Sequence, residues 1–309
     1  MSTTYYSPLR YPGGKGTFSY FLAQVIMRNP DVQYYAEPYA GGAAAALSLL
    51  INGYVKEIYL NDKDIFIYSF WKAMKINPDE FISRVQKTPV TIDEWKKQKE
   101  FYSNPSRLKT ATVLDIGFCT FFLNRCNRSG ILSAGPIGGK EQNGKWKIDV
   151  RFNKQDLVKR LEIIKKLKNK IHLNRGDAID YMRCFFQKHK GISHQQILFY
   201  LDPPYYLQGK KLYKDNYYID KDHLALSKYL YTFSEKWLLS YDDNEFIRDL
   251  YPNNTRKRTK RVNKMNWAYY PKMGREIILA SKSCKLPSGK VKLSKSLLLD
   301  ARQTSLFNK

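Results

Sequence analysis

The sequence contains few cysteines, and their spacing excludes two common uses of that residue. Only Cys119, Cys126, Cys184 and Cys284 occur among 309 residues, and no two of them form a C-x-x-C pair. Structural zinc sites and disulfide frameworks need denser patterns, so we expect no metal ion and reduced thiols. The sequence also lacks a signal peptide and any run of about 18 apolar residues, which predicts a cytoplasmic protein without a membrane span.

Acidic residues are scarce relative to basic ones. Lys and Arg total 53 against 28 Asp and Glu, so the formal net charge is +25 and the pI is near 9.7. Such an excess favours a polyanionic partner, nucleic acid first, over a surface that is basic only for solubility. The hydrophobic fraction of 43% is sufficient for a sizeable core, and the length predicts about two domains.

The most informative segment is Asp-Pro-Pro-Tyr at residues 202–205. It follows the apolar run 197–201, which predicts a short buried strand. Proline has no backbone N–H, so this loop presents carbonyl groups beside a carboxylate. Both kinds of oxygen can accept hydrogen bonds from one exocyclic amino group, and the aromatic ring can stack on a base. We interpret the segment as a pocket for an amino-bearing nucleobase; the alternative is an Asp-Pro turn after a core strand.

A glycine turn lies near the start of the chain. A strand predicted over residues 33–37 leads into Pro-Tyr-Ala-Gly-Gly-Ala at residues 38–43, and an alanine-rich helix is predicted over residues 43–50. The order of strand, glycine turn and helix is typical of the opening of a nucleotide-binding βαβ unit.

An acidic residue follows this unit at a characteristic distance. A second strand, predicted over residues 57–60, leads to Asp62, which lies 20 residues beyond Gly42. An acid at about that spacing typically binds ribose hydroxyls. The alternative is that Asp62 caps a helix beginning near Ile65.

Residues 7–16, Ser-Pro-Leu-Arg-Tyr-Pro-Gly-Gly-Lys-Gly, are similar to a P-loop only superficially. The P-loop pattern requires glycine where Leu9 stands and serine or threonine where Gly16 stands. The segment therefore does not indicate a nucleotide hydrolase. Its two central glycines still permit close backbone approach to a ligand, and Lys15 could meet a carboxylate.

Residues 66–170 differ from the α/β pattern on either side. Amphipathic helices are predicted over residues 92–102 and 111–124, and the glycine-rich stretch 127–153 is expected to be an extended hairpin or loop because residues 145–150 alternate in polarity. We predict an α/β, Rossmann-like sheet with helices on both faces and an inserted, mainly helical domain with a hairpin. The predicted domains are residues 1–65 with 171–290, residues 66–170, and a tail at 291–309. Further strands are predicted over residues 170–173, 196–201, 236–240 and 276–280.

Taken together, these segments resemble a DNA adenine-N6 methyltransferase of the Dam-like D12 class. The resemblance covers roughly residues 7–281, and its motif order, with the insertion between the glycine turn and the Asp-Pro-Pro-Tyr loop, is that of the family's α group. The matching motifs lie at residues 11–15 (Tyr-Pro-Gly-Gly-Lys), 37–43, 61–62, 175–177 (Arg-Gly-Asp) and 202–205.

The resemblance implies a methyltransferase sheet that binds S-adenosylmethionine, with a catalytic loop formed by Asp202, Pro203, Pro204 and Tyr205. Asp202 and the Pro203 carbonyl would accept the amino hydrogens of an adenine flipped out of the duplex, and Tyr205 would stack on it. The cofactor-binding residues it implies are Tyr11, Lys15, Glu37, Tyr39, Ala40, Gly41, Gly42, Asp62, Asp177 and Asp202.

The insertion, as a target-recognition domain, would read double-stranded DNA. Family members that read GATC resemble Asn-Arg-x-x-Phe-Asn-Gly-Leu, whereas residues 124–131 here are Asn-Arg-Cys-Asn-Arg-Ser-Gly-Ile, so a GATC target is not expected. We expect Arg125, Asn127 and Arg128 to contact DNA, with both arginines as candidate guanine readers. Either arginine could instead bind a phosphate or pair with an acid inside the insertion.

A basic cluster at residues 255–264 contains six cations and no acid. Such a run is often a solvated face, but in a chain that resembles a base modifier we interpret it as a phosphate-contacting loop. The residues expected to contact phosphates are Arg256, Lys257, Arg258, Lys260 and Arg261.

The chain differs mildly from the family's motifs at three positions. The family commonly has Trp and Ala where this chain has Tyr11 and Pro12, and a third glycine where this chain has Ala43.

Other functions and partners stay open at this point. The rival reactions are methylation of cytosine N4, of RNA or of a protein amide, and the chain could also be a non-catalytic DNA-binding protein with this fold. A companion restriction enzyme and a prokaryotic or phage origin with nucleoid association are compatible with the resemblance. Residues 303–307 resemble the short peptides that dock on the bacterial sliding clamp, through Gln303, Leu306 and Phe307; the alternative is that this apolar end packs back onto the catalytic domain.

Overall fold

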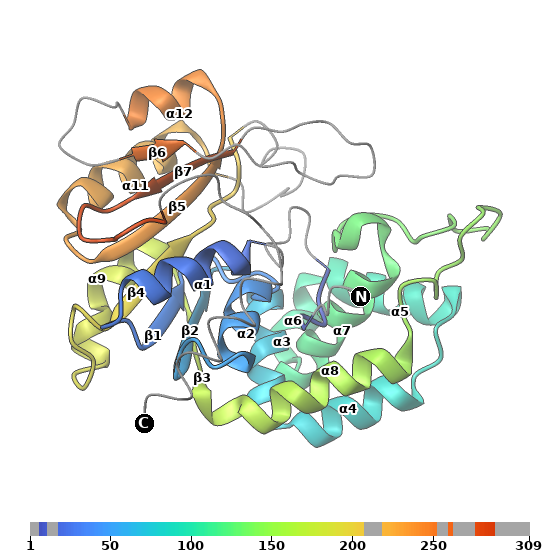
Figure 1. Ribbon diagram of the computed structural model, residues 1–309. Coiled ribbons are helices and arrows are strands. Elements are labelled where there is room, and N and C mark those ends of the chain that lie inside the picture. The colour runs from blue at the N-terminus through green and yellow to red at the C-terminus, as the bar shows by residue number, and fades with distance from the viewer. Residues whose placement is uncertain (1–5, 11–17, 207–217, 252–258, 262–275, 288–309) are drawn as a thin grey trace.

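The structure is a computed structural model, and it describes residues 6–10, 18–206, 218–251, 259–261 and 276–287, with the backbone alone at 259–261 and 276. The described strands form one sheet in the order β3-β2-β1-β4-β5-β7-β6 (Figure 1). They are β1 Tyr34–Glu37, β2 Glu57–Asp62, β3 Ile171–Arg175, β4 Ile197–Leu201, β5 Lys236–Asp242, β6 Thr259–Arg261 and β7 Glu276–Ala280.

The first five strands of this order are parallel, and the last two are antiparallel additions at one edge. From β1 the chain moves outward to β2 and β3, and then returns to place β4 on the other side of β1. The strand order therefore reverses between β1 and β4. In open α/β sheets a ligand binds beyond the carboxyl ends of the strands at such a reversal.

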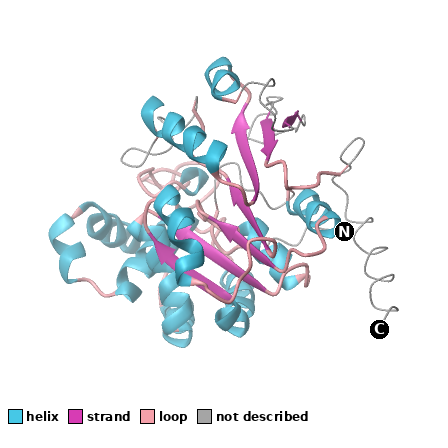
Figure 2. Cartoon of the chain, turned by 90° about the vertical axis from the view of Figure 1, so that its left-hand side faces the viewer, coloured by secondary structure: helices cyan, strands magenta, loops and turns pink. Residues whose placement is uncertain are grey.

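Helices cover both faces of the sheet (Figure 2). Alternate residues of a strand point to opposite faces, so Leu198 and Tyr200 of β4 join one buried cluster, whereas Phe199 and Leu201 join the other. The predicted Rossmann-like α/β sheet is thereby confirmed. The first cluster includes α1 Ser19–Arg28, α2 Ala44–Ile51 and α3 Ile65–Ile76, and the second includes α9 Ala178–Lys188, α11 Asp220–Thr232 and α12 Glu245–Leu250.

The insertion is mainly helical and shares its core with the sheet. The ring of Phe81 lies edge-on to Phe70 of α3 and to Phe121, with centroid distances of 5.6 Å in both cases. These rings belong to the same buried cluster as Tyr35 and Leu198 of the sheet. The domain bounds stay a prediction, but the two predicted units pack as one continuous core. Besides α3, which apart from Ile65 lies within the predicted bounds 66–170 and packs on the sheet, the α-helices of the insertion are α4 Pro78–Lys87, α5 Ile92–Ser103, α6 Pro105–Thr110, α7 Val113–Cys126 and α8 Lys154–Leu167.

The glycine-rich stretch of the insertion, for which a hairpin or a loop was expected, is a loop made of turns, and residues 145–150 form no strand. The side chain of Gln142 takes the place of a strand ladder. Its Nε2 donates to the carbonyls of Ile137 and Gly139, and its Oε1 accepts from the N–H of Ile148. Because these backbone groups bond to one side chain, they do not pair across two strands.

Part of the basic cluster forms a strand. β6 pairs antiparallel with β7 and includes Lys260 and Arg261, which were expected in a phosphate-contacting loop. Arg256, Lys257 and Arg258 lie outside the described residues. The phosphate contacts expected of these three residues therefore stay a prediction from the sequence.

The contact between α3 and α7 generates a stability prediction. A Cβ on Gly117 would lie 2.6 Å from the Ser69 carbonyl oxygen and 3.0 Å from the Ala73 Cβ. Gly117→Ala should therefore lower the free energy of unfolding by about 1–3 kcal/mol, despite the better helix propensity of alanine. Chemical denaturation of purified protein measures this change. The matched control is Gly191→Ala, where a Cβ would meet nothing within 4 Å, and equal stability of the two variants would contradict the prediction.

Candidate active site at the carboxyl edge of the sheet

The pairing of β1 with β4 brings the two main sequence motifs together. In this parallel pair Tyr34 lies opposite Ile197 and Ala36 lies opposite Phe199. β1 ends at Glu37, just before the glycine turn, and β4 ends at Leu201, just before Asp202. The two motifs, which are separated by more than 150 residues in the sequence, thus begin side by side at the strand-order reversal.

Asp62 closes the glycine turn. Its Oδ2 accepts from the Gly41 N–H at 2.9 Å, and its Oδ1 accepts from the Asp64 N–H at 2.9 Å. Burial, followed by the charge of Asp64, raises the pKa of Asp62 to about 7. The side chain that caps α3 is Asp64, which accepts from the Phe66 N–H at 2.7 Å. The alternative of Asp62 as the helix cap is therefore wrong.

The rest of the turn is held by hydrogen bonds to its backbone groups. The Ala40 N–H donates to the Asn61 carbonyl, and the Trp71 indole donates to the Gly41 carbonyl, both at 2.9 Å. Gly41 and Ala43 both have left-handed φ, of 46° and 45°. Ala43 stands where the family commonly has glycine, the residue that adopts this φ at lowest cost.

Glu37 is a buried acid beneath the site. Its Oε1 accepts from the Tyr35 hydroxyl and from the Ala46 N–H, at 3.1 Å each. Burial raises the pKa of Glu37 to about 8, the two hydrogen bonds oppose this rise, and the charge of Asp202 adds to it. The carboxyl groups of Glu37 and Asp202 are thus close enough to affect each other.

Asp202 is oriented from the neighbouring strand. Ser240 of β5 donates from its Oγ to Asp202 Oδ1 at 2.7 Å, and the Tyr200 hydroxyl lies 2.9 Å from the same Oγ. Because the serine hydroxyl has one proton and gives it to Asp202, Tyr200 donates to Ser240. Pro203 is buried, whereas Pro204 and Tyr205 are partly exposed. Sequence reasoning missed Ser240, although the strand predicted over residues 236–240 ends on it.

Tyr218 is a second residue that sequence reasoning missed, and no motif marks it. Its hydroxyl lies 2.6 Å from that of Tyr39, and the rings meet edge to face. Burial raises the pKa of Tyr218, and the charges of Asp177 and Asp62 add to the rise. Asp177 also caps α9, accepting from the Ile179 N–H at 2.9 Å. Tyr39, Asp62, Asp177 and Tyr218 therefore lie near one another around the turn. The first three were predicted as cofactor contacts.

Two predicted cofactor contacts, Tyr11 and Lys15, lie outside the described residues. Of the remaining predicted cofactor contacts, Gly42 accepts a short hydrogen bond through its carbonyl from the Ser7 hydroxyl at 2.5 Å.

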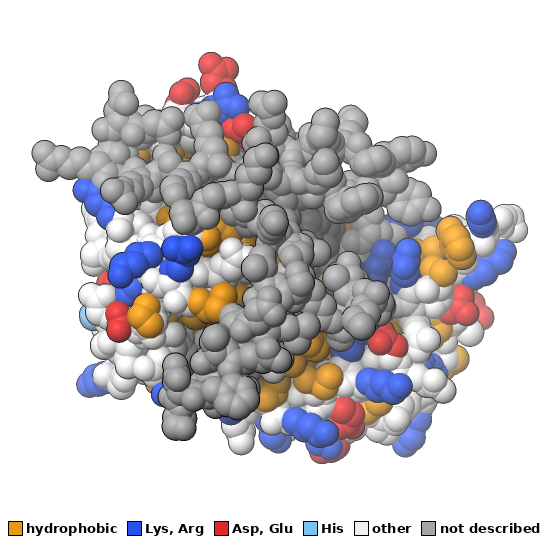
Figure 3. Space-filling model, in the orientation of Figure 1, with side chains coloured by type: hydrophobic (Ala, Val, Ile, Leu, Met, Phe, Trp, Pro, Cys, Tyr) orange, Lys and Arg blue, Asp and Glu red, His pale blue; other side chains and the backbone are white. Residues whose placement is uncertain are grey.

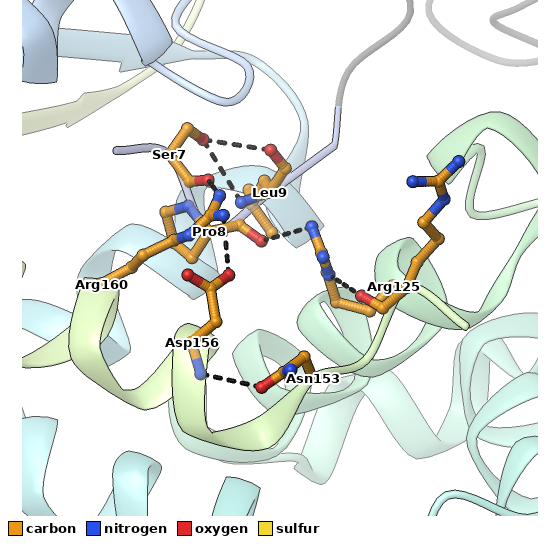
Figure 4. Close-up of polar contacts among 8 residues, drawn as sticks. Ser7, Pro8, Leu9, Arg125, Asn153, Asp156 and Arg160 are labelled. Carbon is orange, nitrogen blue, oxygen red and sulfur yellow. Dashed lines mark hydrogen bonds and ion pairs between the residues drawn. The ribbon is translucent and has the colours of Figure 1, made fainter. Parts of the chain in front are cut away.

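The predicted base readers of the insertion occupy different environments. Arg125 is buried, with Nε donating to the Arg151 carbonyl at 2.7 Å and Nη1 donating to the Pro8 carbonyl at 3.3 Å (Figure 4). Asn127 is fully buried: its Nδ2 donates to the carbonyls of Ile131 and Leu132. Neither side chain can reach a base edge without leaving these partners. Arg128 is exposed and stays the candidate guanine reader.

The described residues contain no group of three or more His, Cys, Asp or Glu side chains that could hold a metal ion. Among the described helices, none is long and apolar enough to cross a membrane.

The chain matches one known protein family, and two solved structures align with it. A family model described as D12 class N6 adenine-specific DNA methyltransferase matches residues 11–265, which include the sheet motifs and the insertion. No curated protein sequence matches significantly. Two solved structures of the rRNA methyltransferase AviRa from Streptomyces viridochromogenes align with the chain at 11% identity. One has a TM-score of 0.36 and covers 85% of this chain and 84% of that chain; the other has a TM-score of 0.33 and covers 82% and 78%.

The buried acid beneath the site generates a pH prediction. Folding raises the pKa of Glu37 from 4.5 to about 8. Between these two pH values the folded state keeps a proton on Glu37 that the unfolded state has already released. The free energy of unfolding should therefore fall as pH rises through this window. Glu37→Gln keeps the shape of the protonated group and should reduce that slope.

Urea unfolding at several pH values measures the slope. Glu141→Gln removes an exposed carboxyl and serves as the control, which should keep the wild-type slope. Identical slopes for wild type and Glu37→Gln would contradict the prediction.

Proposed function

The chain belongs to the D12 class N6 adenine-specific DNA methyltransferase family, and we propose that it methylates N6 of adenines flipped out of double-stranded DNA within a specific sequence. Membership of this family implies S-adenosylmethionine as the methyl donor. The observation that carries the proposal is the parallel pairing of β1 with β4, which makes the glycine turn and the Asp202 loop begin side by side at one edge of the sheet.

The residues of the turn fit this donor. When bound, S-adenosylmethionine supplies an electrophilic methyl group on a positively charged sulfonium. The carboxyl groups of Glu37, which is buried, and Asp62, which is partly buried, have raised pKa values because removal from water disfavours their charged forms. A cationic ligand beside them would favour ionisation of both. Asp62 would accept hydrogen bonds from the ribose hydroxyls, and Gly41 and Gly42 would permit close approach of the backbone.

The catalytic loop fits the exocyclic amino group of adenine. The lone pair of this nitrogen is delocalised into the ring, so the group is a poor nucleophile. Asp202 and the Pro203 carbonyl would accept its two N–H bonds and favour a tetrahedral nitrogen with an available lone pair. Ser240 holds Asp202 through Oδ1, and Tyr205 would stack on the base. Fixed orientation of the reacting groups can supply on the order of 7–11 kcal/mol of barrier reduction.

The basic surface suits DNA, since neutralising phosphates supplies much of the affinity. Lys and Arg side chains are visible over the insertion (Figure 3). We propose that Arg128 reads a base in a target other than GATC and that the cluster at residues 256–261 contacts phosphates. The base must leave the stack to reach the catalytic loop.

The remaining partners rest on the sequence alone. Gln303, Leu306 and Phe307 lie outside the described residues, so docking on the sliding clamp stays a proposal. We likewise propose, from the family resemblance, a companion restriction enzyme, a role in restriction-modification and a cytoplasmic, nucleoid-associated location.

The catalytic role of Asp202 has a direct test. Asp202→Ala should lower kcat at least about 100-fold, because the amino group loses an acceptor and its alignment. Labelled S-adenosylmethionine is incubated with duplex DNA, and the DNA is digested to nucleosides. Wild type should yield label in N6-methyladenine. The control, Asp31→Ala, removes an exposed carboxyl before β1, at the opposite edge of the sheet, and should keep wild-type activity. Label in N4-methylcytosine would overturn the proposed reaction.

The base-reading role of Arg128 has a separate test. A bidentate arginine contact to guanine is worth about 1–3 kcal/mol of discrimination, so Arg128→Ala should relax sequence choice at one position of the site. Modified bases are mapped by sequencing DNA from cells that express each variant. Lys140→Ala, which removes another exposed cation of the insertion, is the control. A uniform loss of affinity for all sequences would assign Arg128 to a phosphate instead.

A further inference from the structure

The segment Ser7 to Arg10 lies between the glycine turn and the insertion. On the side of the turn, Ser7 Oγ donates to the Gly42 carbonyl at 2.5 Å. The contact is close, because a Cβ on Gly42 would lie 3.2 Å from Ser7 Oγ and 3.7 Å from the Leu9 Cβ. A displacement of this segment would therefore act directly on the turn.

On the opposite side, two arginines of the insertion hold the same segment (Figure 4). Arg160 of α8 donates to the Ser7 carbonyl at 3.0 Å and pairs with Asp156 at 2.7 Å. Arg125 of α7 donates to the Pro8 carbonyl. Hydrogen bonds from charged donors are roughly twice as strong as those from neutral donors. The two arginines therefore hold the backbone of this segment more firmly than neutral side chains would.

A third contact fixes the end of the segment. Asn124 accepts from the Arg10 N–H at 2.6 Å and donates to the Arg10 carbonyl at 2.7 Å. Its amide therefore pairs with both backbone groups of one residue, as a neighbouring strand would. Gly130 permits this approach, since a Cβ there would lie 2.6 Å from the Arg10 carbonyl oxygen.

The burial of Arg125 indicates that its position has a function. Burial, followed by the charges of Arg10 and Arg160, lowers the pKa of Arg125 to about 9, which still leaves it charged at neutral pH. A buried charge is costly unless it is paired, and Arg125 donates here to backbone carbonyls of two segments. A residue that only filled this space could be apolar.

We propose that Asn124, Arg125 and Arg160 form a brace through which the target-recognition insertion positions the donor-binding turn. The brace runs from the insertion through the segment Ser7 to Arg10 to the carbonyl of Gly42. This inference rests on the proposed function, because it takes the turn as the donor site. Arg125 is a positioning residue: it sets donor affinity, and Arg128, three residues later, sets the choice of DNA sequence.

The test compares three variants with wild type. Arg125→Met keeps much of the volume and removes the donors, Arg125→Lys keeps the charge and one donor group, and Arg107→Met is the control at an exposed arginine of the insertion. Donor affinity is measured by calorimetry with S-adenosylmethionine, and KM, kcat and sequence preference are measured on duplex DNA. For Arg125→Met we expect about tenfold weaker donor binding, a matching rise in donor KM and unchanged sequence preference. Arg125→Lys should recover part of the affinity, and Arg107→Met should equal wild type.

Several outcomes would overturn the brace. If Arg125→Met binds the donor as tightly as wild type, the brace does not exist. If its sequence choice is also relaxed, Arg125 is a base reader instead. If Arg125→Met does not fold, Ser7→Ala decides, because it removes the hydroxyl that bonds to the Gly42 carbonyl and to the backbone of Leu9 and should weaken donor binding several-fold. Unchanged affinity there overturns the proposal. Failure of wild type to bind the donor would instead overturn the proposed function, and the brace with it.

Discussion

The parallel pairing of β1 with β4 is the constraint on which the site depends. β2 and β3 are added on one side of β1, whereas β4 and β5 are added on the other side. The loops that follow β1 and β4 therefore leave the same edge of the sheet in different directions. The pairing also brings the acids of both motifs close together, since Asp202 contributes to the raised pKa of Glu37. Two nearby carboxyl groups, one buried (Glu37) and one partly buried (Asp202), are unfavourable when both are ionised, which suits the site to a positively charged ligand.

The neighbouring strands complete this arrangement. β2 supplies Asp62, which closes the glycine turn, and β5 supplies Ser240, which orients Asp202. Both side chains come from the carboxyl ends of their strands, where a parallel sheet collects its polar groups. The interior beneath them contains the aromatic rings of Tyr35 and Tyr200, which are stacked at a centroid distance of 6.5 Å. A rigid core thus fixes polar groups that act at its edge.

The insertion is integrated with the sheet at two levels. Its aromatic rings continue the core of the sheet, and its buried polar side chains hold the segment that precedes the glycine turn. Buried polar side chains must find partners in the fold, and for Asn124 and Arg125 those partners are the backbone of a distant segment. This explains why Asn124 and Arg125, which lie in a stretch proposed to recognise DNA, are not on the surface.

The sequence by itself determined the order of the elements and the chemistry of the two loops. The apolar run at residues 197–201 coincides with β4, because a strand buried on both faces is apolar throughout. Strands near residues 34, 57, 171, 236 and 276 were likewise predictable from their patterns. β6 was not, because three residues within a basic run have no apolar pattern and pair only because β7 lies beside them. Only the tertiary structure decided that Arg125 and Asn127 are buried, that Gln142 replaces a hairpin, and that Ser240 and Tyr218 join the site. Each of these depends on contacts between residues far apart in the chain or on the path of a loop, and local sequence patterns do not encode such contacts.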